Sequence, residues 1–188
     1  MGRWEPGADS RLREAAIELF LERGFEQTMV ADIAERAGVT ARTFFRHFAD
    51  KREVIFQGAA DLEEWSLAAL EKAPATASAL ETVEVALDAT ARLLGGDHGF
   101  ARKRQAIIES SAELRERELI KLNSLSARLE EALRRRGFGD LDASLAAATG
   151  IAVYRVAFER WAGAAEDGDL REVIRDTMIH LRALTAAE

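Results

Sequence analysis

The segment TMVADIAERAGVTARTFFRHFADKR, residues 28–52, constrains the fold of this chain more than any other. Apolar residues recur at helical spacing in its first part, which predicts a short helix at about 29–36. Gly38 then permits a left-handed turn, and Thr40 can cap a second helix at about 41–48. Two helices joined in this way form a helix-turn-helix, whose second helix enters the major groove of DNA.

Positive charge gathers on this second helix and just after it. Residues 40–52 contain four basic residues and one acidic residue, a net charge of +3, whereas the whole chain has a formal net charge of -7. The acidic excess lies in residues 53–188, because residues 1–52 contain nine basic and nine acidic residues. The local field governs the approach to DNA, so we expect a DNA-binding domain at 1–52 and an acidic effector-binding and dimerisation domain at 53–188.

The rest of the chain also has helical apolar spacing, and no stretch indicates a strand. The predicted fold is all-α, with about nine helices: a three-helix helix-turn-helix head on a helical ligand-binding and dimerisation body. Thr28 and Asp50 are expected to cap the helices that follow them. Outside the motif, helices are predicted at about 9–23, 50–71, 78–94, 100–110, 112–136, 142–164 and 169–184.

The helix predicted at 142–164 is apolar nearly all round, which is typical of a helix that is buried on every side. One side could face the domain core and the other a second subunit, together with the helix at 169–184. We therefore expect a homodimer through these two helices, because helix-turn-helix proteins commonly act as pairs on two-fold related half-sites. A central core helix in a monomer is the alternative.

Several classes of protein find no support in the sequence. The chain has no cysteine, its N-terminus is polar, and no apolar run of membrane-spanning length was found, so we expect a cytoplasmic protein without a membrane partner. The three histidines lie far apart, and the motifs of common hydrolases, nucleotide-binding enzymes and metalloenzymes are missing. We expect no enzymatic activity, no catalytic residue, no metal site and no cofactor.

The run TMVADIAERAGVTARTFFRHFADKREVI resembles the DNA-binding domain of the TetR family of bacterial transcriptional regulators. The resemblance covers about residues 11–56 and includes the preceding ELFLERGFEQT, the IAxxAGV turn, the Phe-rich second helix and the FxDK that follows it. It implies an all-α homodimer that binds a palindromic operator, with a body that binds a small effector and thereby weakens DNA binding. The body matches only in its length and its number of helices.

Eight residues of the motif are candidates for contacting the DNA operator: Thr28, Thr40, Arg42, Thr43, Phe45, Arg46, His47 and Lys51. Their hydroxyl, imidazole and ammonium groups are expected to contact phosphates, which position a protein on DNA without reading its sequence. Arg42 and Arg46 are the best candidates for contacting bases or the DNA backbone, and the alternative is that they only form a solvated surface. The N-terminal Arg3 is a lesser candidate for an arm in the minor groove.

Two positions depart from what is common in the family. Position 45 is often Tyr there, and Phe45 cannot donate the hydrogen bond of a tyrosine hydroxyl. It could touch a thymine methyl group or only support the helix. Position 42 is often small, whereas Arg42 could reach a guanine edge with two hydrogen bonds. The operator of another member therefore does not transfer to this chain.

An effector cavity in the body is expected to be mostly apolar with a few polar groups. Ten residues are candidates for its lining: Trp65, Phe100, Ile107, Leu122, Asn123, Ser126, Tyr154, Arg155, Phe158 and Trp161. Taken singly, each of them is more often part of an ordinary core or a dimer interface. Their composition favours an apolar or amphipathic small molecule.

The main hypothesis is a sequence-specific DNA-binding transcriptional regulator, a repressor that a small effector releases from a palindromic operator. A second hypothesis is a helical ligand-binding or partner-binding module without sequence-specific DNA binding. A third is a DNA-binding regulator that needs no effector. The sequence does not separate the first hypothesis from the third.

Overall fold

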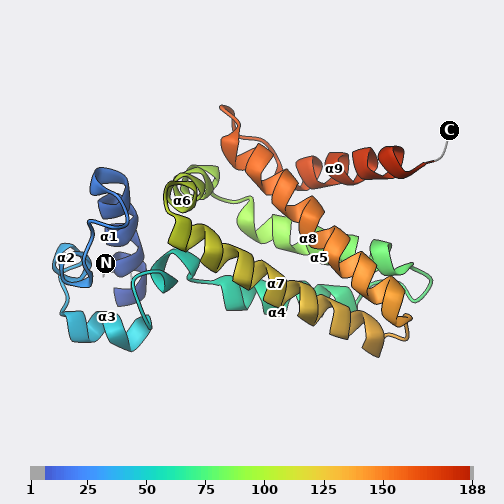
Figure 1. The fold of residues 1–188 in the computed structure, drawn as a ribbon, viewed down its shortest axis with the longest axis horizontal. Helices are drawn as coiled ribbons and strands as arrows, with labels where there is room; N and C mark the ends of the chain where they lie inside the picture. The colour runs from blue at the N-terminus through green and yellow to red at the C-terminus, as the bar shows by residue number, and fades with distance from the viewer. Residues whose placement is uncertain (1–6, 187–188) are drawn as a thin grey trace, which may run out of the picture. The chain divides into compact units, whose positions relative to one another are not determined.

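The computed structural model describes residues 7–186, so the candidate arm at Arg3 lies outside the described residues. These residues are helical and contain no strand, which confirms the predicted all-α fold (Figure 1). The chain forms two compact units: unit 1 comprises residues up to 59 and 103–118, and unit 2 comprises 60–102 and 119 onwards. The helices are α1 (Ala8–Arg23), α2 (Val30–Arg36), α3 (Ala41–His47), the 3-10 helix η1 (Glu53–Phe56), α4 (Ala59–Glu71), α5 (Ala79–Leu94), α6 (His98–Ser110), α7 (Ala112–Arg135), α8 (Asp140–Gly163) and α9 (Leu170–Thr185).

The two units are defined by packing, whereas the predicted division at residue 52 was drawn by function. Unit 1 therefore contains more than the predicted head, since the end of α6 and the start of α7 belong to it. The functional division into a DNA-binding domain and a body stays a prediction.

In unit 1, α1 packs against α2, α3 and η1. Its apolar stripe is buried, as the helical spacing predicts. The fully buried side chains of this unit include Leu12, Ile33, Phe44, Ile55 and Leu114, which come from five separate elements. Unit 1 is thus built around its own apolar core, and this core holds the helix-turn-helix in place.

The helix predicted at 50–71 is wrong, because the structure breaks it in two. Asp50 does accept hydrogen bonds from backbone N–H groups at the start of this segment, but η1 follows and α4 begins only after Gly58. Gly58 has a φ of 85°, which an α-helix cannot accommodate. Three consecutive residues of η1, Val54, Ile55 and Phe56, are all buried, and η1 packs against α1, so this short helix is part of the core of unit 1.

In unit 2, α5, α8 and α9 pack against one another around a core of small and aromatic side chains. Helices α4 and α7 run parallel to each other (Figure 1). Glu63 of α4 pairs with Arg128 of α7 at 2.5 Å, and Arg136, directly after α7, donates to the backbone oxygen of Glu71 at the end of α4 at 2.8 Å. In both contacts the later residue of α4 meets the later residue of the α7 region (63 with 128, 71 with 136), so the two helices run in the same direction.

Helix α8 is apolar nearly all round, but unit 2 buries only one of its faces. Leu141, Leu145 and Val156 remain exposed on the other face. Within residues 7–186, α8 is also the one helix long and apolar enough to cross a membrane, so the expectation that no such run exists was wrong. Because core helices of globular proteins meet the same criterion, and α8 packs against α5 and α9, the finding is weak evidence for a membrane.

A close approach of α8 to α5 makes Gly150 sensitive to any added atom. A Cβ built at Gly150 would lie 2.3 Å from Cγ1 of Val83. We expect Gly150→Ala to lower the free energy of unfolding by about 1–3 kcal/mol, as overpacking does. Urea unfolding, followed by the fluorescence of the buried Trp161, measures this loss.

Two further variants control for this interpretation. Gly163 lies at the end of the same helix, and a Cβ added there would meet nothing within 4 Å, so Gly163→Ala should not destabilise unit 2. Val83→Ala in the Gly150→Ala background should recover part of the loss, because the clash is removed. Equal destabilisation by both glycine variants would show that the contact with Val83 is unimportant.

Candidate nucleic-acid interface

The turn between α2 and α3 has the geometry of a helix-turn-helix. Gly38 adopts a φ of 67°, the left-handed conformation that the sequence predicts for it. The backbone N–H of Val39 donates to the oxygen of Ala34 at 2.9 Å, which closes the end of α2. Thr40 caps α3, since its hydroxyl accepts from the backbone N–H of Thr43 at 3.2 Å. The sequence prediction of this turn and of the Thr40 cap is confirmed.

Two phenylalanines on one side of α3 anchor it to unit 1. Phe44 is 0% exposed and Phe48 is 7% exposed, and their ring centroids lie 5.4 Å apart. Phe48 comes four positions after Phe44, directly after α3 ends, and both buried rings lie on the same side of the helix. The opposite face consequently points to solvent and carries Arg42, Phe45 and Arg46.

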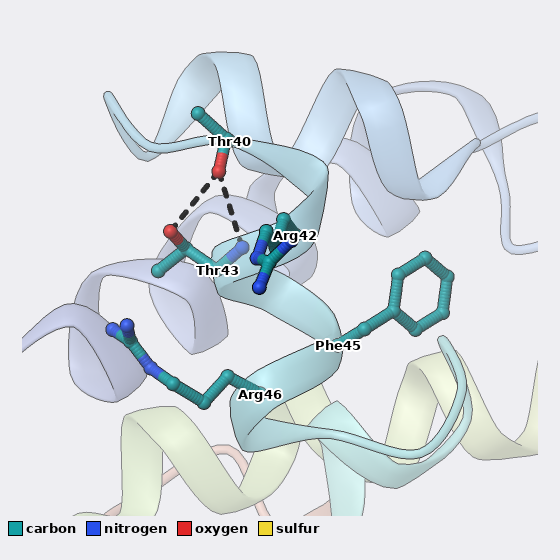
Figure 2. A pocket seen from close by; sticks show the side chains of 5 residues that line it. All are labelled: Thr40, Arg42, Thr43, Phe45 and Arg46. Carbon is teal, nitrogen blue, oxygen red and sulfur yellow. Dashed lines mark hydrogen bonds between the residues drawn. The ribbon is translucent and has the colours of Figure 1, made fainter.

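An open surface pocket lies on this exposed side of α3 (Figure 2). Five residues line it: Thr40, Arg42, Thr43, Phe45 and Arg46. The hydroxyl groups of Thr40 and Thr43 lie 3.1 Å apart at one end, and the Phe45 ring supplies an apolar surface. Five of the eight predicted DNA-contact residues therefore meet at one surface that combines hydroxyl, guanidinium and aromatic groups.

The charges on α3 differ from the other cations near them. Arg23, Arg36 and Arg52 each form ion pairs with carboxylates of unit 1. Within residues 7–186, neither Arg42 nor Arg46 takes part in an ion pair or a side-chain hydrogen bond that the structure records. Both guanidinium groups keep all their donors for an external acceptor, such as a phosphate or a base edge.

The predicted role of Thr28 as a cap is wrong. Met29 occupies the cap position of α2, and the carboxylate of Asp32 accepts from its backbone N–H at 3.0 Å. The Thr28 side chain is 1% exposed, and its hydroxyl donates to the backbone oxygen of Gly24 at 2.8 Å. It turns inward because the end of α1 leaves carbonyl groups without helical partners. This hydroxyl faces the protein, so a phosphate contact through it is incompatible with this structure.

Lys51 has a structural role that the sequence did not indicate. Its ammonium group donates to the backbone oxygens of Phe25 at 2.9 Å and Thr28 at 3.3 Å, and it lies 4.1 Å from the centroid of the Phe25 ring. It thereby ties the turn after α1 to the segment after α3. His47 is exposed at the end of α3. Phosphate contacts by Lys51 and His47 stay predictions.

The ten predicted effector residues do not form one group in the structure. Ile107 belongs to unit 1, and the other nine belong to unit 2. Phe158 and Trp161 are buried in the core of unit 2, where the Phe158 ring stacks with Tyr154, whereas Trp65 is 62% exposed. Asn123 and Arg155 are exposed, and Phe100, Leu122, Ser126 and Tyr154 are half-buried. An effector site built from these residues stays a prediction.

Sequence reasoning missed a set of ion pairs next to α3. Glu53 pairs with Arg117, and Arg52 pairs with Glu113, although about 60 residues separate the partners. No local pattern indicates such pairs, because each residue taken alone resembles an ordinary solvated charge on a helix. Among the described residues there is also no group of three or more His, Asp or Glu side chains that could hold a metal ion.

Taken together, three short helices around one core, a tight turn and an exposed cationic helix define the chain as a helix-turn-helix protein of the class that binds DNA. The sequence profile described as "Bacterial regulatory proteins, tetR family" matches residues 12–57, which span α1 to η1. The chain belongs to the TetR family of bacterial transcriptional regulators.

Relatives and solved structures agree with this assignment. The HTH-type transcriptional regulator TcmR of Streptomyces glaucescens is 36% identical over 140 residues, which cover 71% of this chain and 62% of the relative. The fatty acid metabolism regulator protein of Bacillus subtilis (strain 168) is 29% identical over 127 residues, covering 64% of this chain and 66% of the relative. The chain thus matches slightly less than two thirds of the length of these two relatives.

The fold is shared with a solved structure along nearly all of its length. The transcriptional regulator FadR from Bacillus subtilis, solved in complex with stearoyl-CoA, superposes with a TM-score of 0.64. It is 22% identical, and the superposition covers 92% of this chain and 96% of the other. At this level of identity the likeness concerns the fold alone.

Proposed function

We propose that this protein is a cytoplasmic, sequence-specific DNA-binding repressor that acts as a homodimer and responds to a small molecule. The observation that carries the proposal is that two arginines of α3 have no recorded partner among the described residues. Arg42 and Arg46 face an open surface pocket without intramolecular partners among the described residues, whereas Arg23, Arg36 and Arg52, the other arginines near α3, are paired. A recognition helix needs such free donors, because the bases and phosphates of DNA are its intended acceptors.

The exposed apolar residues of unit 2 support a homodimer. Leu141, Leu145 and Val156 of α8 are exposed, and so are Ile179 and Leu184 of α9. Helices α8 and α9 pack against each other within unit 2, so both could contribute to one self-complementary surface. A dimer would present two copies of α3 to half-sites about 34–36 Å apart, which corresponds to a palindromic operator.

The proposed effector is an apolar or amphipathic molecule. The first probes are suggested by a relative that is named for fatty acid metabolism and by a protein of the same fold that was solved with stearoyl-CoA. Long-chain acyl-CoA thioesters are therefore the compounds to test first. To lower operator affinity a hundredfold, an effector must favour the released state over the DNA-bound state by about 2.7 kcal/mol.

Selection of binding sites from random duplex DNA, with purified protein at fixed physiological salt, tests the proposed function. A two-fold symmetric consensus is expected, because a dimer reads the same bases in each half-site. Failure to enrich any sequence, together with binding that vanishes as salt rises, would contradict sequence reading. In that case the head contacts protein, and a helical ligand-binding or partner-binding module becomes the better description.

The effector needs a separate experiment. The midpoint of thermal unfolding should rise with acyl-CoA concentration, because a ligand that binds the native state stabilises it by mass action. The same concentrations should release the selected operator. A regulator that needs no effector would show neither change across acyl chains of different length.

A further inference from the structure

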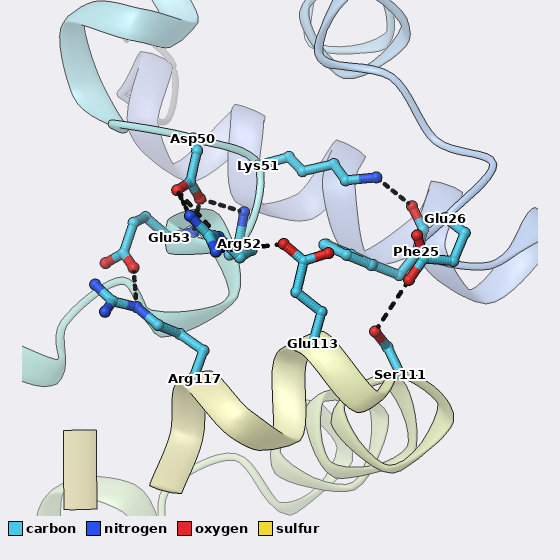
Figure 3. A network of polar contacts seen from close by, with 9 residues as sticks. All are labelled: Phe25, Glu26, Asp50, Lys51, Arg52, Glu53, Ser111, Glu113 and Arg117. Atoms are coloured by element: carbon cyan, nitrogen blue, oxygen red, sulfur yellow. Dashed lines mark hydrogen bonds and ion pairs between the residues drawn. The ribbon is translucent and has the colours of Figure 1, made fainter. Parts of the chain in front are cut away.

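The segment that follows the recognition helix α3 is held by residues far away in the sequence (Figure 3). The end of α6 and the start of α7, residues 103–118, belong to the same compact unit as α1, α2 and α3. We call these residues the α6–α7 segment. Ion pairs and hydrogen bonds connect it to residues 50–56, which begin shortly after α3 ends at His47.

Arg52 is the first residue fixed in this way. Its backbone N–H and its guanidinium both donate to the carboxylate of Asp50, at 2.8 Å and 3.0 Å. These hydrogen bonds hold the pKa of Asp50 below its ordinary value, so the carboxylate stays ionised. The other side of the guanidinium lies 3.3 Å from the carboxylate of Glu113 in the first turn of α7. Glu113 therefore contacts a side chain that is already oriented by Asp50.

Arg117, one helical turn after Glu113, fixes the next residue of the chain. Its guanidinium donates to the carboxylate of Glu53 at 2.7 Å (Figure 3). The backbone N–H of Glu53 donates in turn to Asp50 at 3.3 Å. Two successive residues after α3 are thus paired with two residues on one face of α7, four positions apart.

Two more contacts reinforce the arrangement. Arg104 of α6 donates to the backbone oxygen of Ile55 at 3.2 Å and to the carboxylate of Glu118 at 3.1 Å. Ser111, between α6 and α7, is buried, and its hydroxyl donates to Glu26 at 3.4 Å, in the turn that leads into α2. The α6–α7 segment consequently contacts the chain both before and after the helix-turn-helix.

We propose that Glu113 and Arg117 are positioning residues for operator recognition: they fix residues 52 and 53 and thereby set the orientation in which α3 meets the operator. Neither residue belongs to α3. The inference rests on the proposed function, because it concerns how the recognition helix is held during sequence reading. Loss of either ion pair widens the range of orientations of α3, which weakens binding to the operator more than binding to DNA of unrelated sequence.

Glu113→Gln is the most discriminating test. The loss of its negative charge and the loss of its positioning role should change operator affinity in opposite directions. Removing an acidic group from a protein that binds a polyanion should strengthen DNA binding or leave it unchanged. Loss of positioning should instead weaken operator binding by about two- to fivefold, which corresponds to one ion pair of this kind, with unrelated DNA bound as before. Titration of both DNA duplexes at one fixed salt concentration measures the ratio of the two affinities.

The chain offers a matched control for each charge. Glu116 and Arg115 are exposed on the same helical turns of α7 and have no recorded side-chain partner within residues 7–186. Glu116→Gln and Arg115→Gln change the charge as Glu113→Gln and Arg117→Gln do, but should keep the ratio of operator to unrelated DNA affinity. Thermal unfolding shows whether each variant is folded, and a lower folded fraction would reduce both affinities equally.

Three outcomes decide the inference. A reduced affinity ratio in Glu113→Gln and Arg117→Gln, with wild-type ratios in both controls, supports it. An unchanged ratio in all four variants, in a protein that still prefers its operator, overturns the positioning role and leaves the proposed function standing. A wild-type protein without any sequence preference overturns both.

Discussion

Replacing Phe44 with alanine should lower the free energy of unfolding of unit 1 by about 3–5 kcal/mol, the usual loss for a fully buried phenylalanine. Phe44 is 0% exposed and packs edge-to-face against Phe45 at 5.5 Å between ring centroids. Truncation leaves a cavity on the side of α3 that anchors it to α1, and the short helix has few other apolar contacts to hold it. Operator binding should fall together with stability.

The neighbouring Phe45 provides a matched control for this loss. It belongs to the same helix, but 58% of its surface is exposed, so Phe45→Ala should change the free energy of unfolding by no more than about 0.5 kcal/mol. Amide hydrogen exchange in α1 to α3 is the appropriate measurement, because the two tryptophans among the described residues, Trp65 and Trp161, both report on unit 2. Equal protection of these amides in the two variants would contradict the assignment of Phe44 as the anchor of α3.

Arg42→Ala should weaken operator binding by about 1–3 kcal/mol, roughly five- to 150-fold, while affecting unrelated DNA much less. Arg42 lies in the first turn of α3, where recognition helices approach base edges, and its guanidinium has no recorded partner within residues 7–186. Arg42→Lys should also bind the operator more weakly than the wild-type protein, since an ammonium group cannot donate two parallel hydrogen bonds to guanine. Competition binding with operator variants measures the change.

Two controls separate base reading from simple attraction. Arg92→Ala removes the same charge from α5 in unit 2 and should leave operator preference unchanged. Replacing guanines of the operator with 7-deazaguanine removes the N7 acceptor, and this should weaken binding of the wild-type protein but not of Arg42→Ala. If the variant keeps the wild-type preference across operator variants, Arg42 contacts only the backbone of DNA.

Local signals in the sequence predicted most helix ends within two residues. Thr40, Ser78 and Asp169 cap the helices that follow them, because a hydroxyl or carboxylate needs only the next few backbone N–H groups as partners. Gly24 and Gly38 adopt positive φ at the ends of α1 and α2 for an equally local reason. Most of the surface of α3 was predictable too, since the spacing of Phe44 and Phe48 leaves Arg42 and Arg46 on the opposite side.

The cap prediction failed where a side chain had a second hydrogen-bond acceptor within reach. Thr28 was expected to cap α2, yet its hydroxyl bonds to the backbone at the end of α1. The phosphate contact expected of Lys51 stays a prediction, but its ammonium group also contacts carbonyl groups of the preceding turn and the Phe25 ring, which the motif alone does not indicate. In both cases the folded chain makes a contact that the residues of the motif alone do not indicate.

The sequence by itself determined the helices, the turn at Gly38 and the cationic face of α3, because backbone conformation and helical periodicity depend on neighbouring residues. Only the tertiary structure decided that η1 interrupts the helix expected at 50–71 and that Glu113 and Arg117 hold the segment after α3. The physical reason is distance along the chain. Ion pairs between residues about 60 positions apart, and the burial of three consecutive residues of η1, exist only once the helices of unit 1 have packed together.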